Sequence, residues 1–252
     1  MIYSKEQARL NLIAAVRLIG KHFEVKDWRT EAETRLKRKL DAFFKKMNDR
    51  IAGFLSTSPA WSDIPEAFWD EIQLGTLDIL LPEMRLLALE GAERLGEKLP
   101  MAVNWELVNQ RAVDAATNYA YNRVTNLTDT GRNLLQESIS DFFDKGWTHE
   151  DLVNKLIDFG EVRADMIATT ETTRASAMGE YALSDELEAE GVKMIGVWHT
   201  ENDELVCEIC GPRDGMKEGD GWERIGEDGY EQPPAHVNCR CWVGHESEGY
   251  YD

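Results

Sequence analysis

Four cysteines and one histidine near the end of the chain have the types and the spacing of metal ligands. Two residues separate Cys207 from Cys210, two separate His236 from Cys239, and Cys241 follows. A pair at this spacing can bind one ion from a tight turn, and a second pair completes a tetrahedron of ligands. Because all four cysteines of the protein lie in this window, the pattern predicts one structural zinc ion.

Five candidate ligands compete for four positions. The shared two-residue spacing favours Cys207, Cys210, His236 and Cys239, and Cys241 could take the place of His236 or Cys239. Disulfides and free thiols are the alternatives to a metal. The first residues of the chain lead into a charged helical pattern and not into a signal peptide. We therefore expect reduced thiols, which favour metal over cystine.

The segment between the two ligand pairs is poorly suited to fold by itself. Residues 211–235 contain six glycines, three prolines and seven acidic residues. So polar a segment buries too little apolar surface to offset the entropy that it loses on ordering. Structural zinc contributes roughly 10–16 kcal/mol of apparent binding energy in small finger peptides, and it could supply the difference here.

The charge of the 252-residue chain is unevenly distributed around a net value of −19. Residues 1–52 hold 13 Lys or Arg against 7 Asp or Glu, whereas residues 53–252 hold 15 against 40. This asymmetry suggests a basic arm that meets an acidic partner, which would be nucleic acid or an acidic protein surface. The alternative is a solvated helix face, formed by Arg35, Lys37, Arg38, Lys39, Lys45 and Lys46.

Composition argues against two classes of protein. No uninterrupted apolar run approaches the roughly 18 residues that a membrane span needs. Residues 196–252 hold four Lys or Arg against fourteen Asp or Glu, so a nucleic-acid-binding zinc ribbon at this end would repel phosphate. If the protein contacts DNA, residues 1–52 should do it.

Helical periodicity dominates the chain up to about residue 190. Apolar residues recur at three- and four-residue steps over 28–54, and alanines mark one face of a helix over 104–127. A helix over 161–190 is rich in small residues, which would let another backbone approach closely. Residues 192–199 have the pattern of a strand. We therefore expect a mainly α fold with a small C-terminal β-containing zinc module, an α+β arrangement.

Turn and cap residues divide this pattern further. A first helix is expected over 4–23, Pro65 and Pro82 are placed to begin helices, and Gly160 should separate two more. Three regions are predicted: an N-terminal helical region with the basic arm over 1–103, a helical core over 104–191, and a zinc-binding module over 192–252.

Enzymatic interpretations have little support in the sequence. His199 and Glu201 before Cys207 and Cys210 superficially match a zinc deaminase. However, Val206 stands where that motif has proline, and five residues cannot form the crossover helix that a deaminase needs. No H-E-x-x-H and no phosphate-binding loop occurs. We expect no enzyme, hence no catalytic residue and no cofactor other than zinc; a zinc-dependent hydrolase or deaminase is the weaker alternative.

Spaced residues over roughly the last 150 positions resemble the Mu F-like minor head protein family, the head morphogenesis proteins of tailed bacteriophages. Thr169 departs from this pattern, since the family has arginine there. The resemblance is carried by Arg163, Ile167, Ala168, Thr170, Glu171, Trp198, Asp203, Cys207, Cys210, Pro233, Pro234, His236, Cys239, Arg240 and Cys241.

The resemblance implies a low-copy structural component of the virion that acts near the portal in head assembly or genome delivery. Expected partners are the portal or the major capsid protein, with packaged DNA as a further candidate for residues 1–52. Neither a membrane nor a small-molecule substrate is expected. The protein would lie in the capsid interior, and in the host cytoplasm during assembly. The alternative is a zinc-stabilised adaptor that binds a protein partner outside any virion.

Overall fold

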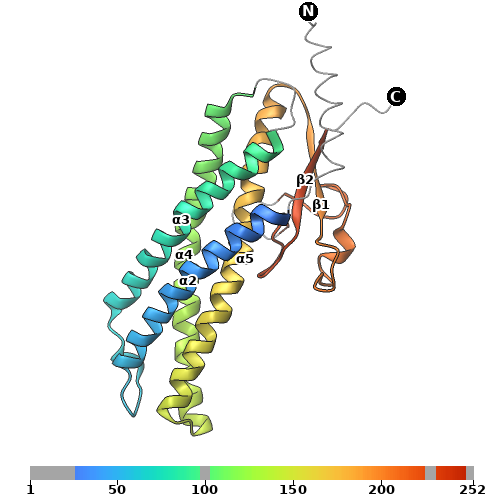
Figure 1. The fold of residues 1–252 in the computed structure, drawn as a ribbon. Helices are drawn as coiled ribbons and strands as arrows, with labels where there is room; N and C mark the ends of the chain where they lie inside the picture. The colour runs from blue at the N-terminus through green and yellow to red at the C-terminus, as the bar shows by residue number, and fades with distance from the viewer. Residues whose placement is uncertain (1–25, 97–102, 225–230, 248–252) are drawn as a thin grey trace, which may run out of the picture. The chain divides into compact units, whose positions relative to one another are not determined.

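In the part of the chain that the structure describes, four long helices and a two-stranded sheet make up most of the fold (Figure 1). The structure, a computed structural model, describes residues 26–96, 103–224 and 231–247. The helix expected over 4–23 lies outside these residues. The elements are α2 (Lys26–Phe54), α3 (Glu66–Gly96), α4 (Trp105–Lys145), α5 (His149–Ala189), β1 (Met194–His199) and β2 (Trp242–Ser247), with short 3-10 turns at Trp61–Asp63 and Gly211–Arg213. The predicted fold class is confirmed.

Local signals set several helix boundaries. At the start of α5, the Thr148 hydroxyl accepts the amide N–H of Asp151 at 3.1 Å, and the Asp151 carboxylate accepts the amide N–H of Thr148 at 2.8 Å. These two bonds form a reciprocal capping box. Pro65 directly precedes α3, and Gly191, with a φ of 86°, follows α5 in the left-handed conformation that favours glycine.

Two predicted breaks do not occur. Gly160 lies inside α5 and Pro82 lies inside α3. Glycine costs about 1 kcal/mol in a helix interior, and proline costs about 3 kcal/mol. Burial outweighs these costs, because Leu156 and Ala164 on either side of Gly160 both join hydrophobic clusters. Leu80, just before Pro82, is fully buried as well.

The chain forms two compact units, and all four helices contribute residues to both. Unit 1 comprises Met1–Ala32, Met84–Thr117 and Thr169–Asp252, and unit 2 comprises Glu33–Glu83 and Asn118–Ala168. The division into regions 1–103, 104–191 and 192–252 stays a prediction. No helix in the described ranges is long and apolar enough to cross a membrane.

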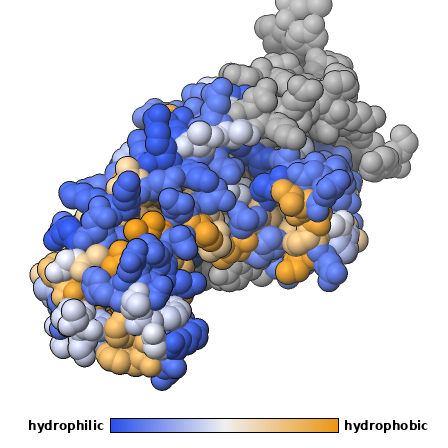
Figure 2. Space-filling view, turned by 60° about the horizontal axis from the view of Figure 1, so that its bottom comes forward, coloured by the Kyte–Doolittle hydropathy of each residue, from blue (hydrophilic) through white to orange (hydrophobic). Residues whose placement is uncertain are grey.

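Unit 2 is held together by apolar clusters between helix segments. The side chains expected to face inward from α2 are buried there, including Leu36, Leu40 and Met47. Some basic residues of unit 2 form ion pairs: the Glu83 carboxylate lies 2.8 Å from Arg35 and 2.6 Å from Lys39. Figure 2 shows a mostly hydrophilic face, on which apolar side chains form separate patches.

Unit 1 contains the close helix contact that the small residues of α5 predict. A Cβ at Gly91 of α3 would lie 2.6 Å from the Ser176 carbonyl oxygen of α5, and a Cβ at Gly179 would overlap the Ala88 carbonyl oxygen. Glycine at both positions therefore lets the two backbones touch. This packing fixes the segment of α5 on which the Cys/His loops rest.

The sheet of unit 1 is a single antiparallel pair (Figure 1). Its register runs from Met194 opposite Ser247 to His199 opposite Trp242. Trp198 of β1, Val243 of β2 and Tyr181 of α5 belong to one buried cluster, which also contains Cys210, Cys239 and Cys241. The sheet thus brings the segment after β1 and the segment before β2 together, and these two segments carry the candidate ligands.

Candidate metal centre

The first ligand pair lies in a tight turn after β1. The amide N–H groups of Cys210 and Gly211 both donate to the Cys207 carbonyl, at 3.1 and 2.9 Å. This tight turn is the local structure that the two-residue spacing predicts for a pair of metal ligands. Cys207 is half-buried and Cys210 is buried.

The second set of ligands comes from the segment that leads into β2. His236, Cys239 and Cys241 precede Trp242, the first residue of the strand. Asn238 adopts a φ of 64° between His236 and Cys239. Asparagine tolerates this left-handed conformation better than most residues, so it suits the sharp turn that this spacing requires.

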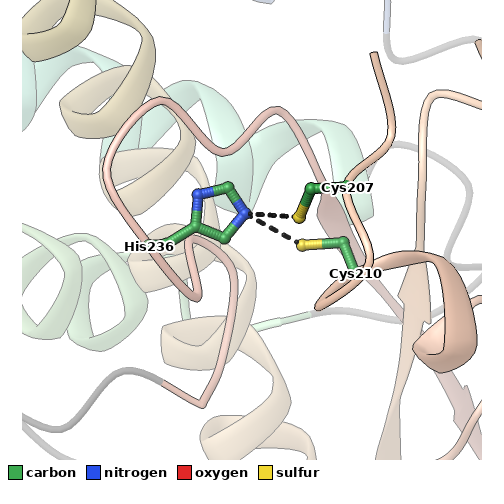
Figure 3. Close-up of side chains that lie close together, drawn as sticks. All are labelled: Cys207, Cys210 and His236. Atoms are coloured by element: carbon green, nitrogen blue, oxygen red, sulfur yellow. Dashed lines mark hydrogen bonds between the residues drawn. The ribbon is translucent and has the colours of Figure 1, made fainter. Parts of the chain in front are cut away.

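The two sets meet in unit 1. Nε2 of His236 lies 3.1 Å from Sγ of Cys207 and 3.2 Å from Sγ of Cys210 (Figure 3). The Sγ atom of Cys239 lies 3.7 Å from the Sγ atom of Cys210. Cys210, Cys239 and Cys241 form a second group whose sulfur atoms lie within 4.8 Å of one another. All five candidate ligands therefore gather around Cys210.

These distances suit a tetrahedral metal site. Bonds of about 2.3 Å to sulfur and about 2.0 Å to nitrogen give edges of about 3.8 Å between two sulfurs and about 3.5 Å between sulfur and nitrogen. The 3.7 Å between Cys210 and Cys239 matches the first edge, and the contacts of His236 are slightly shorter than the second. A cavity of about 20 Å³ lies among the five residues, enough for one water-sized occupant. The cluster could bind a metal.

Hydrogen bonds within the cluster favour the thiolate form of Cys239 and Cys207. The hydrogen bond with Cys210 holds the pKa of Cys239 far below its usual range, and the same contact raises the pKa of Cys210. Burial opposes ionisation of Cys207, but hydrogen bonds from the backbone at Cys210 and Ile209 lower its pKa overall. A thiolate that neighbouring thiols already stabilise is a ready ligand for a cation.

The Thr-rich segment of α5 supports the second ligand segment. Thr170 accepts the amide N–H of Asn238 at 2.8 Å, and the Thr173 hydroxyl donates to the Cys239 carbonyl at 3.0 Å. Arg174 donates to the Pro234 carbonyl at 3.1 Å. The support of this segment by α5 was not foreseen from the sequence. The signal was the density of hydroxyl side chains on a helix that has few bulky ones.

The residues of the deaminase alternative have other contacts. His199 stacks on Trp242 with ring centroids 4.0 Å apart. Glu201 forms a 2.6 Å ion pair with Arg29 of α2. Neither belongs to the two groups of candidate ligands found among the described residues. The contact of Arg29 with this region was not foreseen.

The chain was compared with protein-family models, and the one for Phage Mu protein F like protein matches residues 133–244. Residues 133–244 are a Phage Mu protein F-like domain. The family is one of head morphogenesis proteins, which are structural components of phage heads and not known enzymes. The resemblance noted in the sequence is confirmed over this range. Comparisons with curated proteins and with solved structures gave no match.

The Mu F-like domain contains every candidate ligand. It begins within α4, includes all of α5 and β1, and ends within β2. The Cys/His cluster and the threonines that support it are therefore parts of the same domain. Arg29 lies outside the matched range.

Proposed function

We propose that this protein is a minor head protein of a tailed phage, present at low copy near the portal, where it acts in head assembly or genome delivery. The observation that carries the proposal is the Mu F-like match over residues 133–244. The protein would reside in the capsid interior, and in the host cytoplasm while heads assemble. Its partners would be the portal or the major capsid protein.

A structural zinc ion forms part of this proposal. The assigned ligands are Cys207, Cys210, His236 and Cys239, which leaves Cys241 as the spare thiol. The distances around Cys210 and the cavity of about 20 Å³ support a metal at this cluster, and the shared two-residue spacing supports the choice of these four ligands. When bound, zinc would hold the two ligand segments together and close the coordination sphere, so that no position remains for a reactive water.

The basic arm would contact a polyanionic surface, either packaged DNA or an acidic face of the portal. In the part of the arm that the structure describes, Arg38, Lys45 and Lys46 are exposed on α2. They lie at positions i, i+7 and i+8, which fall on one side of a helix. Lys37 and Lys39 instead pair with Asp165 and Glu83 at 2.6 Å each. Arg38, Lys45 and Lys46 are therefore the assigned contacts.

Particle composition tests the proposed function. Virions purified from cells that express a tagged copy of the protein should contain it at a few copies per portal, measured by quantitative mass spectrometry. Its removal should yield heads with defects in assembly or DNA delivery. A protein that stays in the lysate and is absent from purified particles would favour the adaptor function and contradict the proposal.

A further inference from the structure

Arg29 is a buried arginine near the start of α2, with a side chain only 8% exposed. One guanidinium nitrogen donates to Oε1 of Glu201 at 2.6 Å. The other donates to the backbone carbonyls of Cys241 and Arg240, in longer hydrogen bonds of 3.4 and 3.5 Å. Its partners lie 172 to 212 positions away along the chain.

The partners of Arg29 lie on both ligand segments. Glu201 lies in the segment that leads from β1 to Cys207, and its side chain lines the cavity among the candidate ligands. The carbonyls of Arg240 and Cys241 belong to the segment that leads into β2. One guanidinium therefore joins the two segments whose separation decides whether a metal can be bound.

The chemistry of arginine suits this position. Its planar group carries five N–H donors in a fixed fork and remains charged when buried. A lysine could satisfy Glu201 but could not span a carboxylate and two carbonyls with a rigid group. A metal bound by several thiolates also carries net negative charge, so a nearby cation is favourable.

We propose that Arg29 is a positioning residue for the metal centre, which presets the distance between the two ligand segments before the ion binds. The inference rests on the zinc site of the proposed function. Because Arg29 precedes the matched range of 133–244, the metal affinity of the Mu F-like domain depends on the start of α2. The domain would then not be self-sufficient as a metal-binding module.

The test is metal affinity in the full-length protein. Arg29→Met should weaken Zn²⁺ binding by about 10- to 100-fold, the usual cost of losing a group that orients metal ligands, measured by competition with a chromophoric chelator. With Co²⁺ as probe, the thiolate charge-transfer and d–d bands should shift, because loosened ligand segments change the coordination geometry. Arg29→Lys should give an intermediate affinity.

Arg94 provides the matched control. Its guanidinium lies 4.8 Å from the ring centroid of Trp28, the residue before Arg29. Arg94→Met therefore removes an arginine contact from the same turn of α2 without touching the ligand segments. It should lower thermal stability but leave the Zn²⁺ affinity and the Co²⁺ spectrum unchanged. A loss of affinity in this control equal to that of Arg29→Met would assign the effect to general destabilisation and overturn the inference.

The outcomes separate the two proposals. If the unaltered protein takes up no Zn²⁺ or Co²⁺, the zinc site itself is wrong and the inference falls with it. If the unaltered protein binds and Arg29→Met binds as tightly, only the role of Arg29 is overturned. If Arg29→Met does not fold, the Zn²⁺ affinities of Arg29→Lys and Glu201→Gln test the proposal instead. Unchanged Zn²⁺ affinity in both variants would contradict it.

Discussion

Nδ1 of His245 lies 3.8 Å from Oε2 of Glu180, and both side chains are buried between β2 and α5. Burial raises the pKa of Glu180 to about 8, although Arg29 and a hydrogen bond from Ser176 partly oppose the shift. Burial also lowers the pKa of His245 to about 3, with the charge of Arg224 acting in the same direction and that of Asp185 against it. At neutral pH the pair is therefore an uncharged carboxyl beside a neutral imidazole.

This pair predicts a stability that varies with pH. Glu180 keeps its proton in the folded state up to about pH 8, whereas its ordinary pKa is 4.5, so stability falls as pH rises through that window. His245 is neutral in the folded state down to about pH 3, against an ordinary pKa of 6.5, so stability falls as pH drops through that window. The two effects oppose each other between about pH 4.5 and 6.5.

Chemical denaturation across pH 3 to 9 measures this behaviour. As pH rises from 6.5 to 8, ionisation of Glu180 in the unfolded state should lower the free energy of unfolding by about 2 kcal/mol, since one pKa unit corresponds to about 1.4 kcal/mol. Glu180→Gln should remove that decline, because an amide does not ionise. Glu188→Gln, at an exposed position of the same helix, is the control and should retain it. A decline that persists in Glu180→Gln would assign it to another group.

We predict one bound zinc per chain. Cys207→Ser should abolish stoichiometric zinc and expose the segment between Cys207 and Cys241 to protease, because a hydroxyl is a poor zinc ligand and the polar segment cannot order itself. Elemental analysis and limited proteolysis measure the two effects. Metal-free protein with an equally protected segment would refute the zinc assignment.

Serine variants of Cys239 and Cys241 test which of these two thiols binds zinc. If Cys241 is the spare, Cys241→Ser should retain one zinc per chain, whereas Cys239→Ser should lose it. Both changes replace one buried thiol with one hydroxyl, so each controls for the other. Loss of zinc in Cys241→Ser, with retention in Cys239→Ser, would exchange the roles of the two thiols.

The exposed basic residues of α2 should dominate any binding to duplex DNA. Replacing Arg38, Lys45 and Lys46 with glutamine removes up to three phosphate contacts, so the slope of log affinity against log salt should become shallower by about 2.7. Fluorescence anisotropy at several salt concentrations measures this slope. The same variant should be incorporated less efficiently into heads.

Lys37 and Lys39 provide the comparison, because their charges are engaged with Asp165 and Glu83. Their replacement by glutamine should change the salt slope much less. Equal effects of the two variants would show that the whole arm acts only through its net charge. If the variant at Arg38, Lys45 and Lys46 binds DNA normally and is incorporated normally, these residues form only a solvated helix face.

The contact of α3 with α5 should not tolerate a side chain at Gly179. A Cβ there overlaps the Ala88 carbonyl oxygen, and overpacking of a tight interface typically costs about 1–3 kcal/mol. Gly179→Ala should lower the free energy of unfolding by at least that amount. Gly53→Ala is the control: nothing lies within 4 Å of that Cβ in α2, so alanine should be neutral or stabilising by up to about 1 kcal/mol. Equal stabilities would argue against the close contact.

The sequence alone determined the features that depend on neighbouring residues. Two-residue spacing brought the thiols of Cys207 and Cys210 into one turn, and Thr148 with Asp151 set the start of α5. The resemblance to the Mu F-like family could also be recognised from the sequence, because metal ligands and turns require particular residue types at fixed spacings. The choice of four ligands among five stays a prediction. Sequence spacing constrains the geometry within each ligand pair, but it does not fix how the two pairs are placed around one ion.

Tertiary structure decided what depends on distant partners. Arg29 and Glu201 are 172 positions apart, and no local pattern marks an arginine that will be buried. The helices continue through Pro82 and Gly160 because buried neighbours outweigh local propensity. The shifted pKa values of Glu180 and His245 arise only from burial, which the chain acquires when β2 packs against α5.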